Sequence, residues 1–172
     1  AYNINEVPGC WTMINNHGYN SGAYPMAYIN NSTSYVHSGS KSLYLRSSNA
    51  EPLYAVMPLF NANNVTVSFY YRNEGTSASN GTLVLGTMTD PTDASTFTAI
   101  RTLDRVTTLT QVSENILGLN GRYIAFKYEN GTAQNYYLGI DDINVTLISD
   151  INKCIYDDRK FDGGVEANYY KQ

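Results

Sequence analysis

The chain has little charge, and it has no long apolar run. Only 15% of its 172 residues are charged, against about a quarter in ordinary globular proteins. The formal net charge is −4, so the basic surface that nucleic-acid binding requires is missing, and we expect no nucleic-acid partner. No stretch approaches the roughly 18 apolar residues of a membrane-spanning helix. The sequence therefore predicts no membrane span in this chain.

Cysteine is scarce, with only Cys10 and Cys154 near opposite ends of the sequence. They have no C-x-x-C spacing, and His17 and His37 do not complete a zinc set with them. Two interpretations stay open. Both cysteines are buried thiols, or they form a disulfide that ties the end of the chain back to its beginning, as an exported composition allows.

In place of charge the chain has 20 Asn, 16 Thr, 16 Tyr and 14 Ser. This composition is typical of a secreted or surface-exposed β protein rather than of a helical cytosolic enzyme. The length suits one domain that buries roughly two-thirds of its unfolded surface. We therefore expect an extracellular or bacterial cell-surface location.

Alternating residues predict strands. In Asn64–Arg72, the side chains of Val65, Val67, Phe69 and Tyr71 fall on one face, which is the period-2 pattern of a half-buried strand. Clusters of Gly, Asn and Asp separate further segments of the same kind, and no window shows a convincing helical period. The other predicted strands are Ser42–Arg46, Pro52–Leu59, Thr82–Met88, Phe97–Leu103, Val106–Val112, Arg122–Tyr128 and Tyr137–Ile148.

These short strands with regular turns predict an all-β fold, a two-sheet antiparallel β-sandwich of the jelly-roll type over residues 1–149. Residues 150–172 differ, because they hold nine of the 26 charged residues. We expect this charged C-terminal segment to pack partly on the sandwich or to link it to a further domain. The chain would then be a monomeric domain of a larger protein.

Several motifs together resemble a known group of domains. They are NEVPGCW at Asn5–Trp11, HSGSKSLYL at His37–Leu45, VSFYYR before Asn73, RYIAFKY at Arg122–Tyr128 and YYLGIDDINV at Tyr136–Val145. Their order and spacing resemble the cleaved adhesin and choice-of-anchor J domains of Bacteroidetes surface proteins. Those domains are MAM-like and similar to jelly-roll carbohydrate-binding modules. The resemblance implies a jelly roll, and it places Trp11 in the core.

The resemblance also implies a structural Ca²⁺ ion. Its ligands in such domains map onto Glu6, the stretch Ser38–Lys41 (Ser38, Lys41) and Asp141 or Asp142. Independently, Asp141 shares a face of the last predicted strand with Ile143, Val145 and Leu147, so its carboxylate should point inward and need a partner. Oxygen ligands from three remote segments suit Ca²⁺. The alternative is that these acidic residues cap turns or pair with Lys41.

A second acidic stretch, Asp90–Asp93, is explained by turn chemistry alone. The chain also lacks an enzyme signature. A glycosidase needs two carboxylates across a cleft, whereas Asp141 and Asp142 are adjacent in a strand and cannot converge on one bond. No G-x-S-x-G motif occurs, and His17 and His37 fit ordinary loop histidines. We expect no enzyme.

Tyrosine is the stronger functional lead, because exposed aromatic rings stack on sugars. Tyr70 and Arg72 fall on the face opposite Val65, Val67 and Phe69, so we expect both to face solvent and to contact ligand. The segment from Tyr19 to Tyr35, interpreted as a loop, adds Tyr24 and Tyr28 as ligand-binding candidates. The alternative is that tyrosine is simply a good strand residue.

Three functions follow from these features. The first is a non-catalytic extracellular module that binds carbohydrate, with a glycan as partner. The second is a MAM-like adhesion module, in which the same tyrosines bind a host or extracellular protein. The third is a structural spacer in a longer surface protein.

Overall fold

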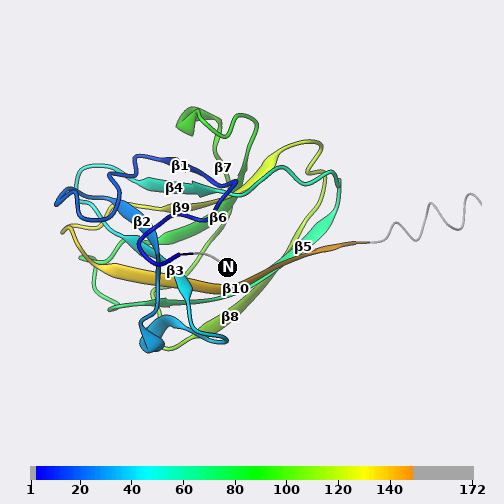
Figure 1. Cartoon of the computed structure of the whole chain (residues 1–172). Helices are drawn as coiled ribbons and strands as arrows, with labels where there is room; N and C mark the ends of the chain where they lie inside the picture. The colour runs from blue at the N-terminus through cyan, green and yellow to red at the C-terminus, as the bar shows by residue number, and fades with distance from the viewer. Residues whose placement is uncertain (1–2, 149–172) are drawn as a thin grey trace, which may run out of the picture.

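The computed structural model describes residues 3–148, and they form a sandwich of two antiparallel sheets, as predicted (Figure 1). Each sheet has five strands. Sheet A has the strand order β1-β4-β9-β6-β7, and sheet B has the order β2-β3-β10-β5-β8. The elements are β1 (Thr12–Ile14), β2 (Met26–Asn30), the 3₁₀ helix η1 (Thr33–Tyr35), β3 (Ser42–Arg46), β4 (Leu53–Val56), β5 (Val65–Asn73), β6 (Leu83–Met88), the 3₁₀ helix η2 (Ala94–Thr96), β7 (Thr98–Thr102), β8 (Thr110–Ile116), β9 (Tyr123–Tyr128) and β10 (Tyr137–Leu147). Among these residues no helix is long and apolar enough to cross a membrane.

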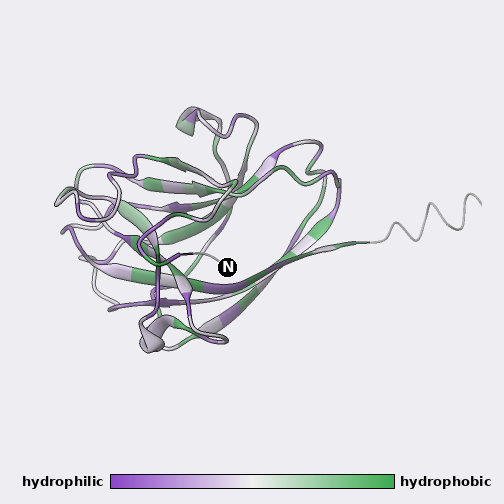
Figure 2. Ribbon diagram, viewed as in Figure 1, coloured by the Kyte–Doolittle hydropathy of each residue, from purple (hydrophilic) through white to green (hydrophobic). Residues whose placement is uncertain are grey.

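The core lies between the two sheets. Strand β5 shows the predicted alternation in full: Val65, Val67 and Phe69 are completely buried, while the residues between them are half-buried. The ring of Phe69 meets Phe126 of sheet A edge to face, with 5.0 Å between centroids. Trp11 packs against this core and stacks over Phe126, as the resemblance implied. Figure 2 shows the hydrophobic residues concentrated on the strands.

Strands β1 and β2 were not predicted. The interpretation of residues 19–35 as a loop is wrong, because Met26–Asn30 forms a strand that pairs with β3 along its length. Ala27 and Ile29 enter the core, whereas Met26 and Tyr28 are buried among tyrosines on the other side. A strand that is covered on both faces loses the polar-apolar alternation that a sequence pattern detects.

The predicted strand Val106–Val112 is shifted along the chain. Strand β8 begins at Thr110 and ends at Ile116, because pairing with β5 places Val112 opposite Phe69 and Ile116 opposite Val65. Val106 instead lies in the loop before β8, where its carbonyl accepts a backbone hydrogen bond from Asn73 at the end of β5. Burial of Val112 and Ile116 thus fixed the register, which the Thr-rich run before them did not reveal.

The prediction that Asp141 points into the core is wrong. Strand β10 has a bulge between Asp141 and Asn144, where Asp142 adopts a φ of 49°. One extra residue reverses the inward and outward faces beyond it. Asp141 therefore pairs with Tyr70 on the outer face, whereas Ile143 and Val145 beyond the bulge pack against the core as predicted. Leu147 pairs with the buried Val65 but lies at the end of the strand, where it is 76% exposed.

Two further predictions concern parts of the chain at its ends. Cys10 is exposed, so the interpretation of both cysteines as buried thiols is wrong for this residue. Cys154 and the charged segment 150–172 lie outside the described residues, so the disulfide stays a prediction.

The Asp90–Asp93 turn has the predicted local structure. The Asp90 carboxylate accepts the Thr92 N–H, and Asp93 caps η2 by accepting the Ser95 N–H.

Candidate functional site

The outer face of sheet B carries aligned aromatic and polar side chains. Leu43 and Leu45 of β3 enter the core, so Tyr44 and Arg46 between and after them project outward. Tyr44 lies opposite Tyr28 of β2 and Gly139 of β10, and Arg46 lies opposite Met26 and Tyr137. Directly paired residues point to the same face. The strand register therefore gathers residues from three segments that are remote in sequence.

These residues line a pocket of about 440 Å³, here called the tyrosine pocket. Its lining combines five tyrosine rings with four polar side chains. The lining residues are Tyr19, Tyr28, Asn30, Ser32, Tyr35, Tyr44, Arg46, Glu74 and Tyr137.

The rings hold one another by edge contacts. Tyr44 meets Tyr35 at 4.7 Å and Tyr137 at 5.7 Å between centroids, and Tyr19 meets Tyr28 at 4.8 Å. Burial raises the pKa of Tyr44 to about 12. Burial also raises the pKa of Tyr28 and of Tyr35. Their hydroxyls therefore stay protonated at physiological pH, so they remain able both to donate and to accept hydrogen bonds.

The pocket contains one guanidinium and one carboxylate. The Arg46 guanidinium lies between the rings of Tyr24 and Tyr137, at 4.9 and 4.8 Å from their centroids, and donates to the Tyr24 hydroxyl at 3.0 Å. Its Nε is buried without a hydrogen-bond partner. Glu74 accepts the Tyr137 N–H through Oε2. Strong donors and acceptors thus stand beside aromatic rings.

Residues 31–41, here called the 31–41 loop, cross the outer face of sheet B and form one wall of the pocket. Tyr35 of η1 sits directly on Gly139, where an added Cβ would lie 2.6 Å from the Tyr35 Cβ. Arg72 supports the same wall. Its guanidinium lies 4.9 Å from the Tyr35 ring centroid, and it donates to the carbonyls of Ser34 and Thr107.

The far end of the 31–41 loop is fastened to the β10 bulge. Asp141 accepts the N–H groups of His37 and Ser38, and Asp142 accepts from the Ser38 hydroxyl and the His37 ring. The His37 ring stacks on Tyr70 with 3.5 Å between centroids. Hydrogen bonds from Ser38, and next from His37, lower the pKa of Asp142. The loop is therefore held in place at His37 and Ser38 as well as at Tyr35.

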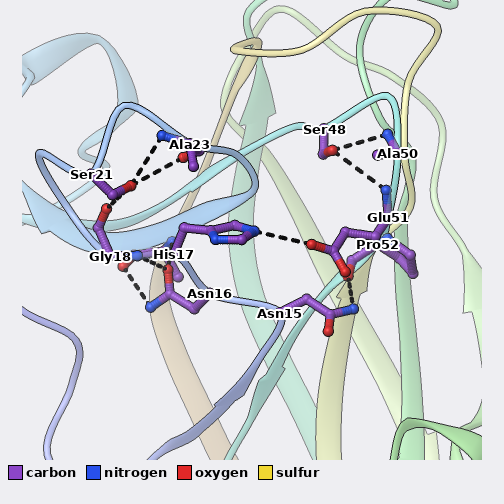
Figure 3. A network of polar contacts seen from close by, with 11 residues as sticks. Asn15, Asn16, His17, Gly18, Ser21, Ala23, Ser48, Ala50, Glu51 and Pro52 are labelled. Atoms are coloured by element: carbon purple, nitrogen blue, oxygen red, sulfur yellow. Dashed lines mark hydrogen bonds and ion pairs between the residues drawn. The ribbon is translucent and has the colours of Figure 1, made fainter.

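The opposite wall comes from the loop between β1 and β2, which carries Tyr19. Figure 3 shows how this loop is fixed: Asn16 accepts the Gly18 N–H, and the His17 ring lies 3.0 Å from the Glu51 carboxylate. Asn16 also accepts the Ala27 N–H and donates to the Ala27 carbonyl, as a paired strand residue would. These contacts position Tyr19 beside β2, where its ring reaches Tyr28.

The predicted ligand residues divide into two groups. Tyr28 lines the tyrosine pocket, and Tyr24 borders it through Arg46, although Tyr28 is only 3% exposed and belongs to a strand. Tyr70 and Arg72 do lie on the outer face, but both are half-buried and support the 31–41 loop. The sequence prediction missed Tyr44 and Arg46, although their alternation with Leu43 and Leu45 was visible.

Part of the predicted calcium set lies together: Ser38 donates to Asp141 and Asp142, and Lys41 lines a cavity with both of these residues. In residues 3–148 no three His, Cys, Asp or Glu side chains are placed to hold a metal ion. Glu6 is exposed and accepts from the Asn3 amide. One feature favours a cation near Asp141. The Ser42 hydroxyl is buried without a hydrogen bond, and Ser42 and Asp141 line the same cavity. Calcium at Asp141 stays a prediction.

Comparisons with known proteins connect this fold to two groups. No protein-family model matches the chain, and no curated protein matches its sequence. Among solved structures, the K1 cleaved adhesin domain of Lys-gingipain from Porphyromonas gingivalis W83 is similar, with a TM-score of 0.66 and 16% identity over 84% of this chain and 95% of that one. The K2 domain of the same protein has a TM-score of 0.59 and 18% identity, over 83% of this chain and 92% of that one.

A carbohydrate-binding module, TmCBM61, solved with β-1,4-galactotriose, is also similar. Its TM-score is 0.55, with 14% identity over 84% of this chain and 92% of that module. At these identities the likeness shows a shared fold. The chain thus has the jelly-roll architecture of cleaved adhesin domains and carbohydrate-binding modules, which confirms the resemblance noted in the sequence.

Proposed function

We propose that this protein is a non-catalytic carbohydrate-binding module and that the tyrosine pocket is its glycan site. The observation that supports this most strongly is the pocket lining, in which tyrosine rings stand beside one guanidinium and one carboxylate. Tyr19 and Tyr137, the more exposed of these rings, offer aromatic surface to the C–H groups of a sugar. The hydroxyls of Tyr28, Tyr35 and Tyr44 stay neutral, because burial raises their pKa. An extracellular or cell-surface location, within a larger protein, suits this function.

The polar groups of the pocket match sugar hydroxyls. Arg46 has donors left over, since its hydrogen bond to the Tyr24 hydroxyl uses one of the five guanidinium N–H groups. Glu74 uses Oε2 for a backbone N–H, so Oε1 remains able to accept. A sugar hydroxyl both donates and accepts, so it can bond to Arg46 and Glu74 at once. Arg46 and Glu74 flank Tyr137, which places them beside the same ring.

The same lining argues against hydrolysis. Glycoside hydrolysis uses a pair of carboxylates on opposite sides of the bond that breaks. Glu74 is the one carboxylate among the described residues that line the tyrosine pocket. Asp141 and Asp142 lie under the 31–41 loop, where both accept hydrogen bonds from it. Binding without cleavage is therefore the function that this site supports best.

A glycan array that carries β-1,4-galacto-oligosaccharides together with plant and host glycans tests the proposal, followed by calorimetry on the best-bound sugar. Arg46→Gln and Glu74→Gln should each weaken binding by about tenfold, equal to about 1.4 kcal/mol. Lys127→Gln and Glu129→Gln are matched controls, because this ion pair lies on the outer face of sheet A. The controls should bind as the unmodified protein does.

Two results would overturn the proposal. One is that the protein binds no glycan on the array and shows no heat of binding with millimolar sugar in calorimetry. The other is equal weakening by the pocket variants and by the sheet A controls, which would place binding elsewhere. Capture of an extracellular protein that is lost in Arg46→Gln would instead favour the MAM-like adhesion function.

A further inference from the structure

We infer that the tyrosine pocket recognises the end of a glycan, one or two sugar rings, and that Tyr35 is the residue that limits it to this length. This rests on the proposed carbohydrate binding and names the part of the glycan that fits. A site for internal segments of a polysaccharide needs a groove that is open at both ends. Sheet B has no such groove along the row of outward residues that contains the pocket.

The line of outward residues across sheet B shows where such a groove would run. Strand pairing places Tyr28, Tyr44, Gly139 and Arg72 in one row across β2, β3, β10 and β5. Gly139 has no side chain, so the row has a gap at the centre of the sheet. Tyr35 fills that gap, with its Cβ 2.6 Å from the point where a Gly139 side chain would begin. The row is therefore interrupted halfway across.

Beyond Tyr35 the face stays occupied. Arg72 is committed to the carbonyls of Ser34 and Thr107, and its guanidinium underlies the Tyr35 ring. In the next row His37 covers Tyr70. A sugar chain that entered between Tyr19 and Tyr44 would meet this wall after a short distance.

The other side of the pocket is bounded as well. Tyr24 and Tyr137 enclose Arg46, and Tyr19 stands over Tyr28 at the β2 edge of the sheet. The volume of about 440 Å³ lies toward the lower end of the range of ligand sites, about 300–1,000 Å³. The shape thus suits a terminal sugar or disaccharide, with the remainder of the glycan leaving toward solvent.

Calorimetry with an oligosaccharide ladder of the best-bound sugar, from the methyl monosaccharide to the hexasaccharide, tests this. For the unmodified protein the affinity should level off at the disaccharide, with longer members within about twofold. A rise of about tenfold or more from disaccharide to hexasaccharide would overturn the inference and leave the proposed function standing. If no member of the ladder and no glycan on the array binds, the proposed function fails, and the inference fails with it.

Variants of Tyr35 add a second measurement. Tyr35→Ala should open the row toward Arg72, so the hexasaccharide should gain affinity relative to the disaccharide by about fivefold or more. Tyr35→Phe keeps the ring on Gly139 and should keep the flat profile of the unmodified protein. An unchanged flat profile in a folded Tyr35→Ala variant would show that another residue sets the limit. If Tyr35→Ala does not fold, the ladder on the unmodified protein still decides.

Discussion

On the outer face of each sheet, an aromatic ring from a loop packs on a glycine of an inner strand, but a pocket remains beside the ring only on sheet B. On sheet A, Phe97 from the η2 loop sits on Gly86, where an added Cβ would lie 2.5 Å from its ring. On sheet B, Tyr35 from the η1 loop sits on Gly139 in the same manner. In both, a glycine in an inner strand receives an aromatic ring from a loop that folds back over the sheet. Figure 1 shows these two loops on opposite sides of the sandwich.

The difference lies in what surrounds the ring. Phe97 closes over an apolar cluster of Tyr54, Val56, Met88 and Ala125, and Lys127 spans the Tyr54 and Phe97 rings. Lys127 is paired with Glu129. Tyr35 instead leaves a cavity beside it, and the cation there, Arg46, has an unpartnered Nε. A ring that seals one face therefore forms only a wall on the other, where Arg46 and Glu74 line the pocket that we propose as the glycan site.

The largest expected contrast is in the stability of two glycine variants. In Gly86→Ala the new Cβ would lie 2.4 Å from the backbone carbonyl oxygen of Thr98, which the β6–β7 ladder holds. We expect a loss of about 3 kcal/mol in unfolding free energy, or about 6–12 °C in Tm. In Gly139→Ala the new Cβ would lie 2.6 Å from the Tyr35 Cβ, which moves only with its backbone, so η1 must shift. Because η1 belongs to a loop and not to a strand ladder, we expect a smaller loss of about 1–2 kcal/mol. Thermal melting checks this, and equal losses would refute the distinction.

The second test asks whether a metal supports the loop on sheet B. If Asp141 binds Ca²⁺, and the Ca²⁺ concentration is about a hundred times the dissociation constant, removing the ion lowers the free energy of unfolding by about 2.7 kcal/mol. EDTA should then lower Tm by about 5–10 °C, and added Ca²⁺ should restore it. Asp141→Asn should abolish this response, while Asp93→Asn in the exposed η2 loop should keep it. Identical melting curves with and without EDTA, and no calcium by metal analysis, would mean that hydrogen bonds alone hold the loop.

A third test separates the two faces by binding. Tyr19 is 39% exposed and contacts Tyr28 from the pocket rim. Tyr19→Ala should lower glycan affinity by about five- to tenfold, roughly 1 kcal/mol, with little change in Tm. Tyr123→Ala, at the half-buried edge of the sheet A cluster, is the matched control and should not affect affinity. Equal losses in the two variants would contradict a site confined to sheet B.

The smallest expected effect concerns pH and the fastening of the 31–41 loop. Hydrogen bonds from Ser38 and His37 hold the pKa of Asp142 below its ordinary 3.8. A lowered pKa in the folded state stabilises the fold above pH 3.8, and this contribution is lost as the pH falls through the folded value. The Tm advantage of the unmodified protein over Asp142→Asn should thus be present at pH 6 and disappear in strong acid. Asn tolerates the positive φ of Asp142, so the variant should fold. A difference that persists unchanged in strong acid would show that charge is not its cause.

Several parts of the structure were predictable from local pattern. The alternation of Val65, Val67 and Phe69 gave one strand and its buried face, because a half-buried strand repeats every two residues. Segments such as Ser42–Arg46 were predicted with the bounds that the structure has. The same rule failed for Met26–Asn30, which is covered on both sides, and for Asp141, because a bulge changed the phase of β10.

The sequence by itself determined the class of fold, since scarce charge and period-2 strands permit little besides a β-sandwich. It also supplied the chemistry, an excess of tyrosine with few ions. Only the tertiary structure decided which tyrosines meet. Strand pairing brings Tyr28, Tyr44 and Tyr137 together, and the β10 bulge turns Asp141 outward to fasten the loop that carries Tyr35. Long-range register depends on burial across the whole sheet, and no local pattern encodes it.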